Sequence, residues 1–448
     1  MAQSDRGLEE HHQLIEEILH DHPNARHGRT LALVELPPEI LFQILSLLSA
    51  RDLASVSLVC RALREHAIDD RLWARLVNSH LPFPVQDPEP FNSFRRLYLA
   101  HVTFWFIPQY KIWFADNEHT GNLIVARYDH RRGVIEAYRL LADRVHQPEL
   151  VSWSANPDVI IKAFNPTVRL WLDDPVLLLK DPDPSSDMAP IQSCKEERRM
   201  HMPTESQHVF SSFLLCSKQP LKKEDMNPDN IWPPPAIPSD IRTPRNPPRE
   251  EMVQPESASD ISHAVFRLRR WAHFRLRLSP GNNETLVTYA TLDPSLYTPT
   301  PEKPYQGIWV GDYSAHGSEF LLFLQRDSLD TTESSEDDRD DNTRGVIHKG
   351  GLAAIKLTGD PNVPRGEVSF AADDIGSRGL IRVANEEPFR GARIVRAAGL
   401  VAGLGFHDAS AIDAELILMS PDYIGLYWKG LGHASFYRRV DIDALIKI

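Results

Sequence analysis

One stretch decides the first part of the fold: LPPEILFQILSLLSARDLASVSLVCRALREHAIDDRLWARL, residues 36–76. Apolar residues recur in it at the spacing of one helical face. Pro37 and Pro38 suit the first turn of a helix, where backbone N–H groups have no partner, and the acidic Glu39 suits the positive end of the helix dipole. Polar breaks at 51–52 and 69–70 divide the pattern. The stretch therefore predicts three short helices.

After residue 100 the sequence changes to strand-like runs. The runs are rich in aromatic and β-branched residues, and turn sequences separate them. The predicted strands are 102–107, 112–115, 123–128, 134–140, 167–172, 265–278, 285–290, 307–309, 320–325, 353–357, 400–406, 414–419 and 423–428. The sequence predicts an α+β protein, in which N-terminal helices precede a large antiparallel, β-rich, barrel-like domain with disordered insertions.

The expected domain boundaries follow changes in composition. Residues 1–32 are polar, residues 181–260 are rich in Pro, Ser and charge, and 327–343 form an acidic loop. None of these three segments is expected to build a core of its own. The predicted division is a disordered tail at 1–32, the helical unit at 33–80, a connecting helix at 81–100, the β-rich domain at 101–180 and 261–448, and a Pro-rich insertion or linker at 181–260.

Composition limits the classes of function. Of the 448 residues 42% are hydrophobic, enough to bury a core, and three cysteines cannot make a disulfide framework. Because no apolar run approaches a membrane span and the polar start is unlike a secretory signal, we expect a protein of the cytoplasm, the nucleus or both, without a membrane partner. A formal charge of −13 argues against nucleic-acid binding. The expected partner is a protein.

Residues 36–76 resemble the F-box family. Leu36-Pro37, Asp52-Leu53, Val59-Cys60-Arg61 and Leu72-Trp73 carry the resemblance. It implies that the helices dock onto the linker protein Skp1 and, through Skp1, join a cullin and Rbx. The Skp1-binding residues that it implies are Leu36, Pro37, Ile40, Leu41, Leu45, Leu53 and Val59. The alternative that stays open is an ordinary amphipathic helical subdomain.

Much of the β-rich domain is similar to the F-box only protein 31 family, and the chain looks like a fungal relative. The similarity is carried by GIWVGDYSAHGSE at 307–319, KLTGDPNVP at 356–364, GLVAGLGF at 399–406, DYIGLYW at 422–428 and SFYRRV at 435–440. The similarity fails in the loops. The relatives have a long low-complexity insertion before the block that begins at 399, whereas 375–396 of this chain is short. The family resemblance implies capture of target proteins at or near their C-terminus in a pocket of this domain, including the cyclin D tail and chains that end in an amide.

The target-binding residues that this resemblance implies lie in two turns. They are Tyr313, His316, Gly317 and Glu319 in the first turn, and Thr358, Gly359, Asp360, Pro361 and Asn362 in the second. Glycines at such positions permit tight turns or close backbone approach beside the polar groups. The alternative is that Gly-rich turns and Asp-Pro pairs are present simply because loops need them.

A metal site is considered and not predicted. The animal relatives hold zinc with two cysteines and two histidines, and this chain offers Cys194, His201, His208 and Cys216. Their position and spacing do not follow the family's ligands, and a Pro-rich segment gives no reason for four side chains to converge. We therefore expect no metal and no cofactor.

Catalysis is also not expected. His316 and Glu319 could be read as a base and its partner, but no nucleophile motif, phosphate loop or dinucleotide fingerprint accompanies them. The sequence predicts a non-catalytic adaptor, the substrate-recognition subunit of an SCF ubiquitin ligase. The alternative is a Skp1-binding interaction protein without a role in ubiquitin transfer.

Overall fold

The computed structural model divides the chain into two compact units, Met1–Leu76 and Val77–Ile448. The residues that it describes are 33–117, 121–144, 150–181, 183–184, 194–218, 227, 230–245, 247, 252, 254–272, 284–313, 317–327 and 348–448. The predicted tail 1–32 lies outside the described residues, as does the predicted acidic loop apart from Asp327.

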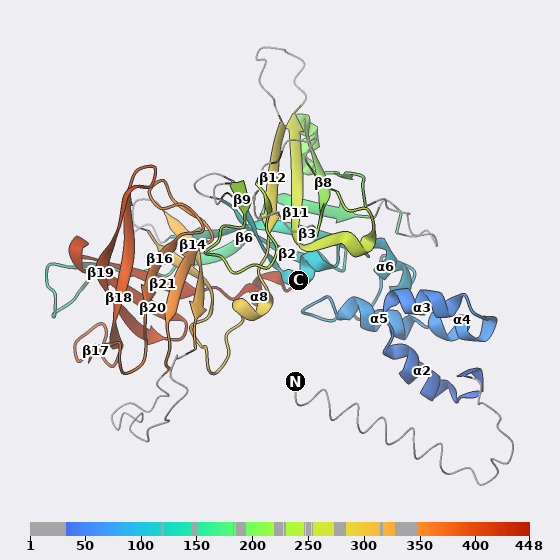
Figure 1. Ribbon diagram of the computed structural model, residues 1–448, viewed down its shortest axis with the longest axis horizontal. Coiled ribbons are helices and arrows are strands. Elements are labelled where there is room, and N and C mark those ends of the chain that lie inside the picture. Colours follow the sequence, from blue (N-terminus) through green and yellow to red (C-terminus); the bar gives the residue numbers. More distant parts are fainter. Residues whose placement is uncertain are drawn as a thin grey trace, which may run out of the picture. The chain divides into compact units, whose positions relative to one another are not determined.

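The first unit is built from short helices (Figure 1). Pro38 opens the first α-helix, and the Ser49 hydroxyl caps the second by accepting a hydrogen bond from the Asp52 N–H at 3.2 Å. Cys60 is extended and separates two helices, so the stretch holds four α-helices where the sequence pattern predicted three. They are α2 Pro38–Ser46, α3 Ala50–Ser57, α4 Arg61–Ala67 and α5 Asp70–Asn78, after a 3-10 turn at Leu33–Glu35.

The second unit contains an eight-stranded antiparallel sheet in the order β6-β3-β2-β1-β12-β11-β8-β7. Its strands are β1 Ile112–Ala115, β2 Leu123–Asp129, β3 Val134–Asp143, β6 Thr167–Lys180, β7 Arg198–Met200, β8 Val209–Ser217, β11 Ile261–Ala272 and β12 Glu284–Ala290. The helices of this unit are α6 Phe94–Ala100, α7 Phe106–Tyr110 and α8 Ile442–Ile446, with 3-10 turns at Pro203–Gln207, Ala258–Asp260, Pro294–Leu296 and Lys429–Leu431. No helix in the described residues is long and apolar enough to cross a membrane.

The C-terminal strands close into an antiparallel barrel, coloured orange to red in Figure 1. β13 pairs with β14 on one side and with β21 on the other, where Gly311 lies opposite Tyr437, and this pairing completes the ring. Its strands are β13 Gly307–Asp312, β14 Ser318–Gln325, β15 Leu352–Lys356, β16 Val368–Ala372, β18 Arg393–Gly403, β19 His407–Ser420, β20 Tyr423–Trp428 and β21 His433–Arg439. Shorter strands complete the unit: β4 Leu150–Ser152, β5 Ile160–Lys162, β9 Ile231–Trp232, β10 Thr243–Pro244 and β17 Leu380–Val383.

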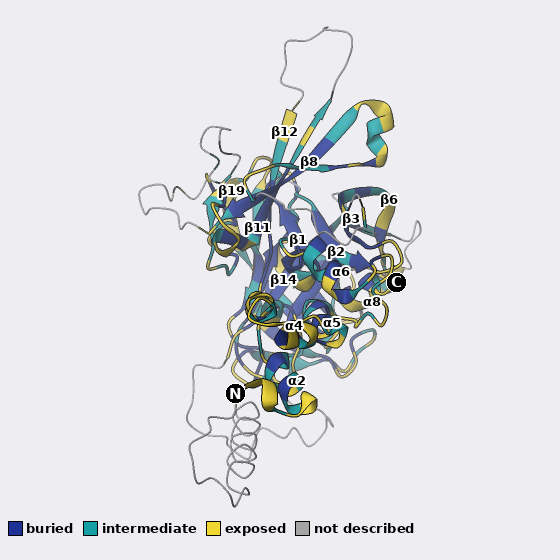
Figure 2. Ribbon diagram, turned by 90° about the vertical axis from the view of Figure 1, so that its right-hand side faces the viewer, coloured by how far each residue is buried: buried dark blue, intermediate teal, exposed yellow. Residues whose placement is uncertain are grey.

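The described residues of the second unit form two apolar cores, and Figure 2 shows its strands mostly buried. Alternate side chains of the barrel strands, such as Trp309, Phe323 and Tyr437, fill the barrel interior. The intervening side chains, such as Leu322, pack with Phe114 and other residues of the first sheet. In β13 and β14, for example, residues of opposite parity therefore serve different cores.

The predicted strand at 102–107 is wrong, because this segment forms turns and the start of α7. Its aromatic content suggested a strand, yet Phe104, Trp105, Phe106 and Ile107 are all buried in succession. Continuous burial does not distinguish the two structures, because the strand β1 is buried at all four of its positions. The N–H groups of Phe104 and Trp105 instead donate to the His101 carbonyl, at 2.8 and 3.1 Å, and these local hydrogen bonds make the segment a turn.

The segment predicted as a Pro-rich insertion or linker, 181–260, is not a linker throughout. β8 lies inside the first sheet, paired with β11 on one side and β7 on the other. Phe213 of β8 is buried against Phe266 of β11, with ring centroids 5.1 Å apart. Its prolines surround strands that the local composition concealed.

Candidate functional site

The helical unit exposes large apolar side chains at the ends of its helices. Leu47, Leu58 and Val59 are 76%, 76% and 70% exposed, and Pro37 is also exposed. Leu47 follows α2, while Leu58 and Val59 lie between α3 and α4. Side chains of this size are more stable out of water, which makes them candidates for contact with a partner.

The predicted Skp1-binding set divides by burial. Leu41, Leu45 and Leu53 are at most 2% exposed, so their assignment as contact residues is corrected: they are core residues of the helices. Leu36 and Ile40 are half-buried. Helical periodicity marks an apolar face but does not say whether that face meets its own unit or a partner.

The two predicted target-binding turns lie at the same end of the barrel. The turn after β13 carries Tyr313 and Gly317, and the turn after β15 carries the segment 358–362. Because β14 pairs with both β13 and β15, the end of β13, the start of β14 and the end of β15 meet. His316 lies outside the described residues.

A buried ionic group connects these turns, and we call it the barrel-end cluster: Tyr313, Glu319, Lys356 and Asp360. Lys356 is fully buried, with its ammonium 2.7 Å from the Glu319 carboxylate and in contact with that of Asp360. The same ammonium lies 4.1 Å from the centroid of the Tyr313 ring, a cation–π contact. One cation therefore holds two carboxylates and an aromatic ring.

The charges of the cluster are coupled. Burial raises the pKa of Glu319 above its ordinary value, although Lys356 opposes the shift. Burial by itself would lower the pKa of Lys356, but the attraction of Glu319 and Asp360 raises it. Burial also raises the pKa of Tyr313 to about 12. Two carboxylates facing one ammonium make the cluster an acceptor of hydrogen bonds rather than a site for another anion.

Asp360 shapes the turn that it belongs to. Its carboxylate accepts hydrogen bonds from the Asn362 N–H at 2.7 Å and the Val363 N–H at 3.1 Å. The Asn362 amide donates to the Ala402 carbonyl at 2.9 Å, which ties the turn to the end of β18. Asp360 is buried, so its position suits a residue that organises the turn.

The other predicted residues of the two turns have smaller roles in the geometry. Gly317 accepts a hydrogen bond from the Tyr313 N–H at 3.0 Å and has a φ of 99°, a conformation that favours glycine. The Thr358 hydroxyl accepts from the Phe320 N–H at 2.8 Å. Pro361 is exposed, and Gly359 is half-buried. These residues place the turns, and Pro361 offers surface.

Sequence reasoning missed Lys356 as a site residue. The signal was present, because Lys356 ends the otherwise apolar run Leu352–Lys356 and lies on the same face as Leu352 and Ala354. A lysine on the core face of a strand needs buried partners.

The four side chains considered for zinc do not form a site in the structure. Cys216 is buried in β8 and accepts a hydrogen bond from Arg267 at 3.2 Å, whereas the His201 side chain is largely exposed. Among the described residues no group of three or more His, Cys, Asp or Glu side chains is placed to hold a metal ion.

Comparison with known families gives two matches. Residues 33–79 match the F-box-like domain, and residues 289–444 match the Cyclin D1 binding domain. The first match covers the described helical segment, so the chain carries an F-box-like domain. The second spans all eight strands of the barrel.

Comparison with curated proteins gives partial similarity to plant proteins. The chain is 29% identical over 143 residues to Protein EXECUTER 2, chloroplastic, of Arabidopsis thaliana, covering 31% of this chain and 21% of that protein. It is 26% identical over 209 residues to Protein EXECUTER 1, chloroplastic, of the same plant, covering 44% and 28%. The chain thus spans less than a third of the length of these relatives.

Proposed function

We propose that this protein is the substrate-recognition subunit of an SCF ubiquitin ligase, a non-catalytic adaptor. Its helical unit binds Skp1, and its barrel binds the target protein. The observation that carries the proposal is the presence on one chain of an F-box-like domain at 33–79 and of a match to a cyclin-binding domain at 289–444, over the barrel. Such an adaptor accelerates ubiquitin transfer by holding the target near the loaded enzyme.

For the barrel we infer capture of a target chain at or near its C-terminus, as the resemblance to the F-box only protein 31 family implies. The end that carries Tyr313 and the segment 358–362 is the inferred site. The barrel-end cluster there holds two carboxylates against one ammonium. An uncharged C-terminal amide can donate hydrogen bonds to such a site, whereas a terminal carboxylate is repelled.

The Skp1 contact is tested by making the exposed apolar surface polar. The L58S/V59S variant is expected to lose co-purified Skp1, cullin and Rbx without a change in melting temperature, since both side chains are exposed. The control is A54S, which changes an exposed residue of α3. Retention of Skp1 by L58S/V59S would contradict the contact. Recovery of Skp1 without cullin and Rbx from the wild-type chain would favour an interaction protein without a ligase role.

The capture site is tested with peptides that copy the C-terminal segment of cyclin D1, prepared as the free acid and as the amide. The Y313A variant is expected to bind the amide peptide at least tenfold more weakly than the wild type, because the ring lies at the inferred site. Y423A is the matched control: Tyr423 is also half-buried, with Arg438 over its ring, near the other end of the barrel.

Two outcomes would reject the capture site. One is equal loss of peptide affinity in Y313A and Y423A, which would indicate general weakening of the barrel. The other is tighter binding of the free acid than of the amide, which would contradict the electrostatic argument. Both are measured by fluorescence anisotropy.

A further inference from the structure

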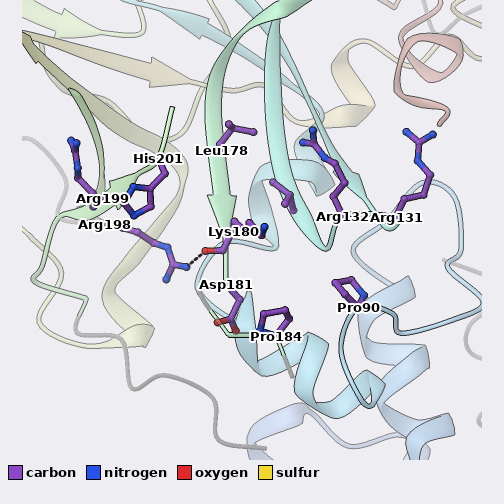
Figure 3. Close-up of a pocket in the computed structure, with 11 residues that line it drawn as sticks. Pro90, Arg131, Arg132, Leu178, Lys180, Asp181, Pro184, Arg198, Arg199 and His201 are labelled. Carbon is purple, nitrogen blue, oxygen red and sulfur yellow. Dashed lines mark hydrogen bonds between the residues drawn. The ribbon is translucent and has the colours of Figure 1, made fainter. Parts of the chain in front are cut away.

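A cavity of about 840 Å³ lies in the second unit, where the outer strands β6 and β7 of the first sheet approach each other. Figure 3 shows the residues that line it. They come from the β2–β3 hairpin, from β6 and the residues after it, from β7, and from the segment before α6. The cavity lies outside the residues that match the Cyclin D1 binding domain.

The lining is strongly basic for a chain with a formal charge of −13. Five of its side chains are cationic: Arg131, Arg132, Lys180, Arg198 and Arg199. Its carboxylate, Asp181, is already in an ion pair with the buried Arg96 at 2.7 Å. Positive charge is therefore concentrated here against the average of the molecule.

Other carboxylates neutralise only part of this charge. Arg131 and Arg132 share Asp129, at 3.3 and 3.1 Å. Arg132 also contacts Glu136, which is shared with Arg127.

Arg199 of the lining pairs with Glu205, at 2.8 Å. Among the residues that the structure describes, the lining side chains and their direct ion-pair partners comprise six cations and four carboxylates, an excess of two positive charges.

Lys180 and Arg198 supply this excess. Within the described part of the chain, neither forms an ion pair with a carboxylate. The Arg198 guanidinium donates to the Lys180 carbonyl at 2.7 Å, drawn in Figure 3, and lies over the Phe104 ring. Burial lowers the pKa of Arg198 from its ordinary value, with Asp181 opposing. An incoming anion would stabilise a charge that the fold leaves incompletely compensated.

The charges are spread out and do not converge on one point. In Figure 3, Arg198 and Arg199 lie on one side of the strand that carries Leu178 and Lys180, and Arg131 and Arg132 lie on the other. A single compact anion cannot reach both sides at once. Several negative side chains spaced along an extended segment can do so.

The size and the apolar lining favour a peptide over a larger polyanion. Pro90, Val134, Leu178 and Pro184 lie between and beside the cationic groups. Such side chains suit contact with a polypeptide, whereas a nucleic-acid backbone prefers an extended basic face. The volume suits a few residues of a chain.

We propose that this cavity binds a short acidic segment of a protein partner, with several Asp or Glu side chains along it. The proposal rests on the proposed function only in taking that partner to be the protein delivered for ubiquitination. Target recognition then has a second contact, separate from the barrel end.

The test uses the full chain without Skp1 or cullin, so its outcome does not depend on ligase assembly. The probe is a labelled peptide of alternating Glu and Gly, compared with its Gln counterpart, with a Gln peptide that carries a single phosphothreonine, and with an oligothymidylate of equal charge. Wild type is expected to bind the Glu peptide most tightly, with affinity that falls as salt rises.

The K180E/R131E variant reverses two exposed charges of the cavity and is expected to bind the Glu peptide more than tenfold more weakly. R378E/R390E changes the net charge equally at exposed positions outside the cavity and is expected to bind like wild type. If K180E/R131E does not fold, K180Q/R131Q is compared with R378Q/R390Q. The expected loss of affinity for the Glu peptide is then roughly three- to tenfold.

Three results would overturn the proposal: equal affinity in the cavity and control variants, tighter binding of the phosphothreonine peptide, or tighter binding of the oligothymidylate. A Y313A chain that still binds the Glu peptide would separate this cavity from the barrel end. Failure of the cyclin D1 peptide together with binding of the Glu peptide would count against the proposed function alone.

Discussion

Lys356 is the cation of the barrel-end cluster. It is fully buried, and its ammonium holds the carboxylates of Glu319 and Asp360. The cost of burying these charges is high unless each is paired. The cluster is therefore most vulnerable to the loss of its single cation.

Replacing Lys356 by Met is expected to lower the free energy of unfolding by about 3–5 kcal/mol, because two carboxylates are left facing each other. The double variant K356M/E319Q removes one of these charges and is expected to lose less stability than K356M. Urea denaturation at neutral pH measures both. A K356M variant no less stable than K356M/E319Q would contradict the role of the ion pair.

The same residue explains what the sequence could and could not say at this scale. Its strand and its inward face follow from the alternation of Leu352 and Ala354. Its partners do not, since Glu319 is 37 positions earlier in the numbering and β15 meets β14 only by folding.

At the scale of elements, α6 and the β2–β3 hairpin are joined through a buried histidine. His101 follows α6, is fully buried, and its Nε2 lies 3.2 Å from the Gly133 carbonyl in the hairpin. Burial, reinforced by the positive charge of Arg198, lowers the pKa of His101 to about 4. The histidine is therefore neutral when the hairpin is docked at neutral pH.

This histidine predicts a pH dependence. In the unfolded chain it takes up a proton near its ordinary pKa of 6.5, but the folded state resists protonation down to about 4. The stability that neutral His101 supports is fully present above pH 6.5 and is lost as the pH falls toward 4, by about 3 kcal/mol in total.

The measurement is the free energy of unfolding by urea near pH 7 and near pH 4.5, for the wild type and H101Q. Glutamine keeps a donor for Gly133 but does not titrate. H101Q is expected to show a smaller loss between the two pH values. An identical loss in both proteins would assign the acid sensitivity to other groups.

Elements were predicted well where local pattern decides them and poorly where packing does. The strand β20 begins and ends as its alternation predicts, at Tyr423 and Trp428. The segment 102–107 was predicted as a strand because its residues favour strands, but local backbone hydrogen bonds, such as that from the Trp105 N–H to the His101 carbonyl, make it turns and the start of α7. β8 was hidden in a Pro-rich segment because its partner β11 comes much later in the chain.

At the scale of the whole molecule, the division into two units separates the two proposed tasks. Met1–Leu76 contains most of the F-box-like domain, and Val77–Ile448 contains the barrel and the basic cavity. The described residues of the second unit build apolar cores of their own. The second unit should therefore fold without the first.

A fragment of residues 77–448 is expected to unfold cooperatively, with a melting temperature within a few degrees of the corresponding transition in the full chain. It should keep the affinity for the C-terminal amide peptide and lose Skp1. Differential scanning calorimetry and the anisotropy assay measure these properties. A fragment that aggregates or melts without cooperativity would show that the second unit is not stable without the first.

Local sequence by itself determined that 36–76 is helical, and also most strands and the two turns of the barrel, because periodicity and turn residues act over a few positions. Only the tertiary structure decided that β13 pairs with β21 to close a barrel, that Lys356 meets Glu319 and Asp360, and that β6 and β7 bring the basic side chains together. It also decided which leucines of the F-box-like stretch are core and which are surface. Each of these features depends on contacts between residues far apart in the chain. The free energy of such contacts cannot be read from a local sequence pattern.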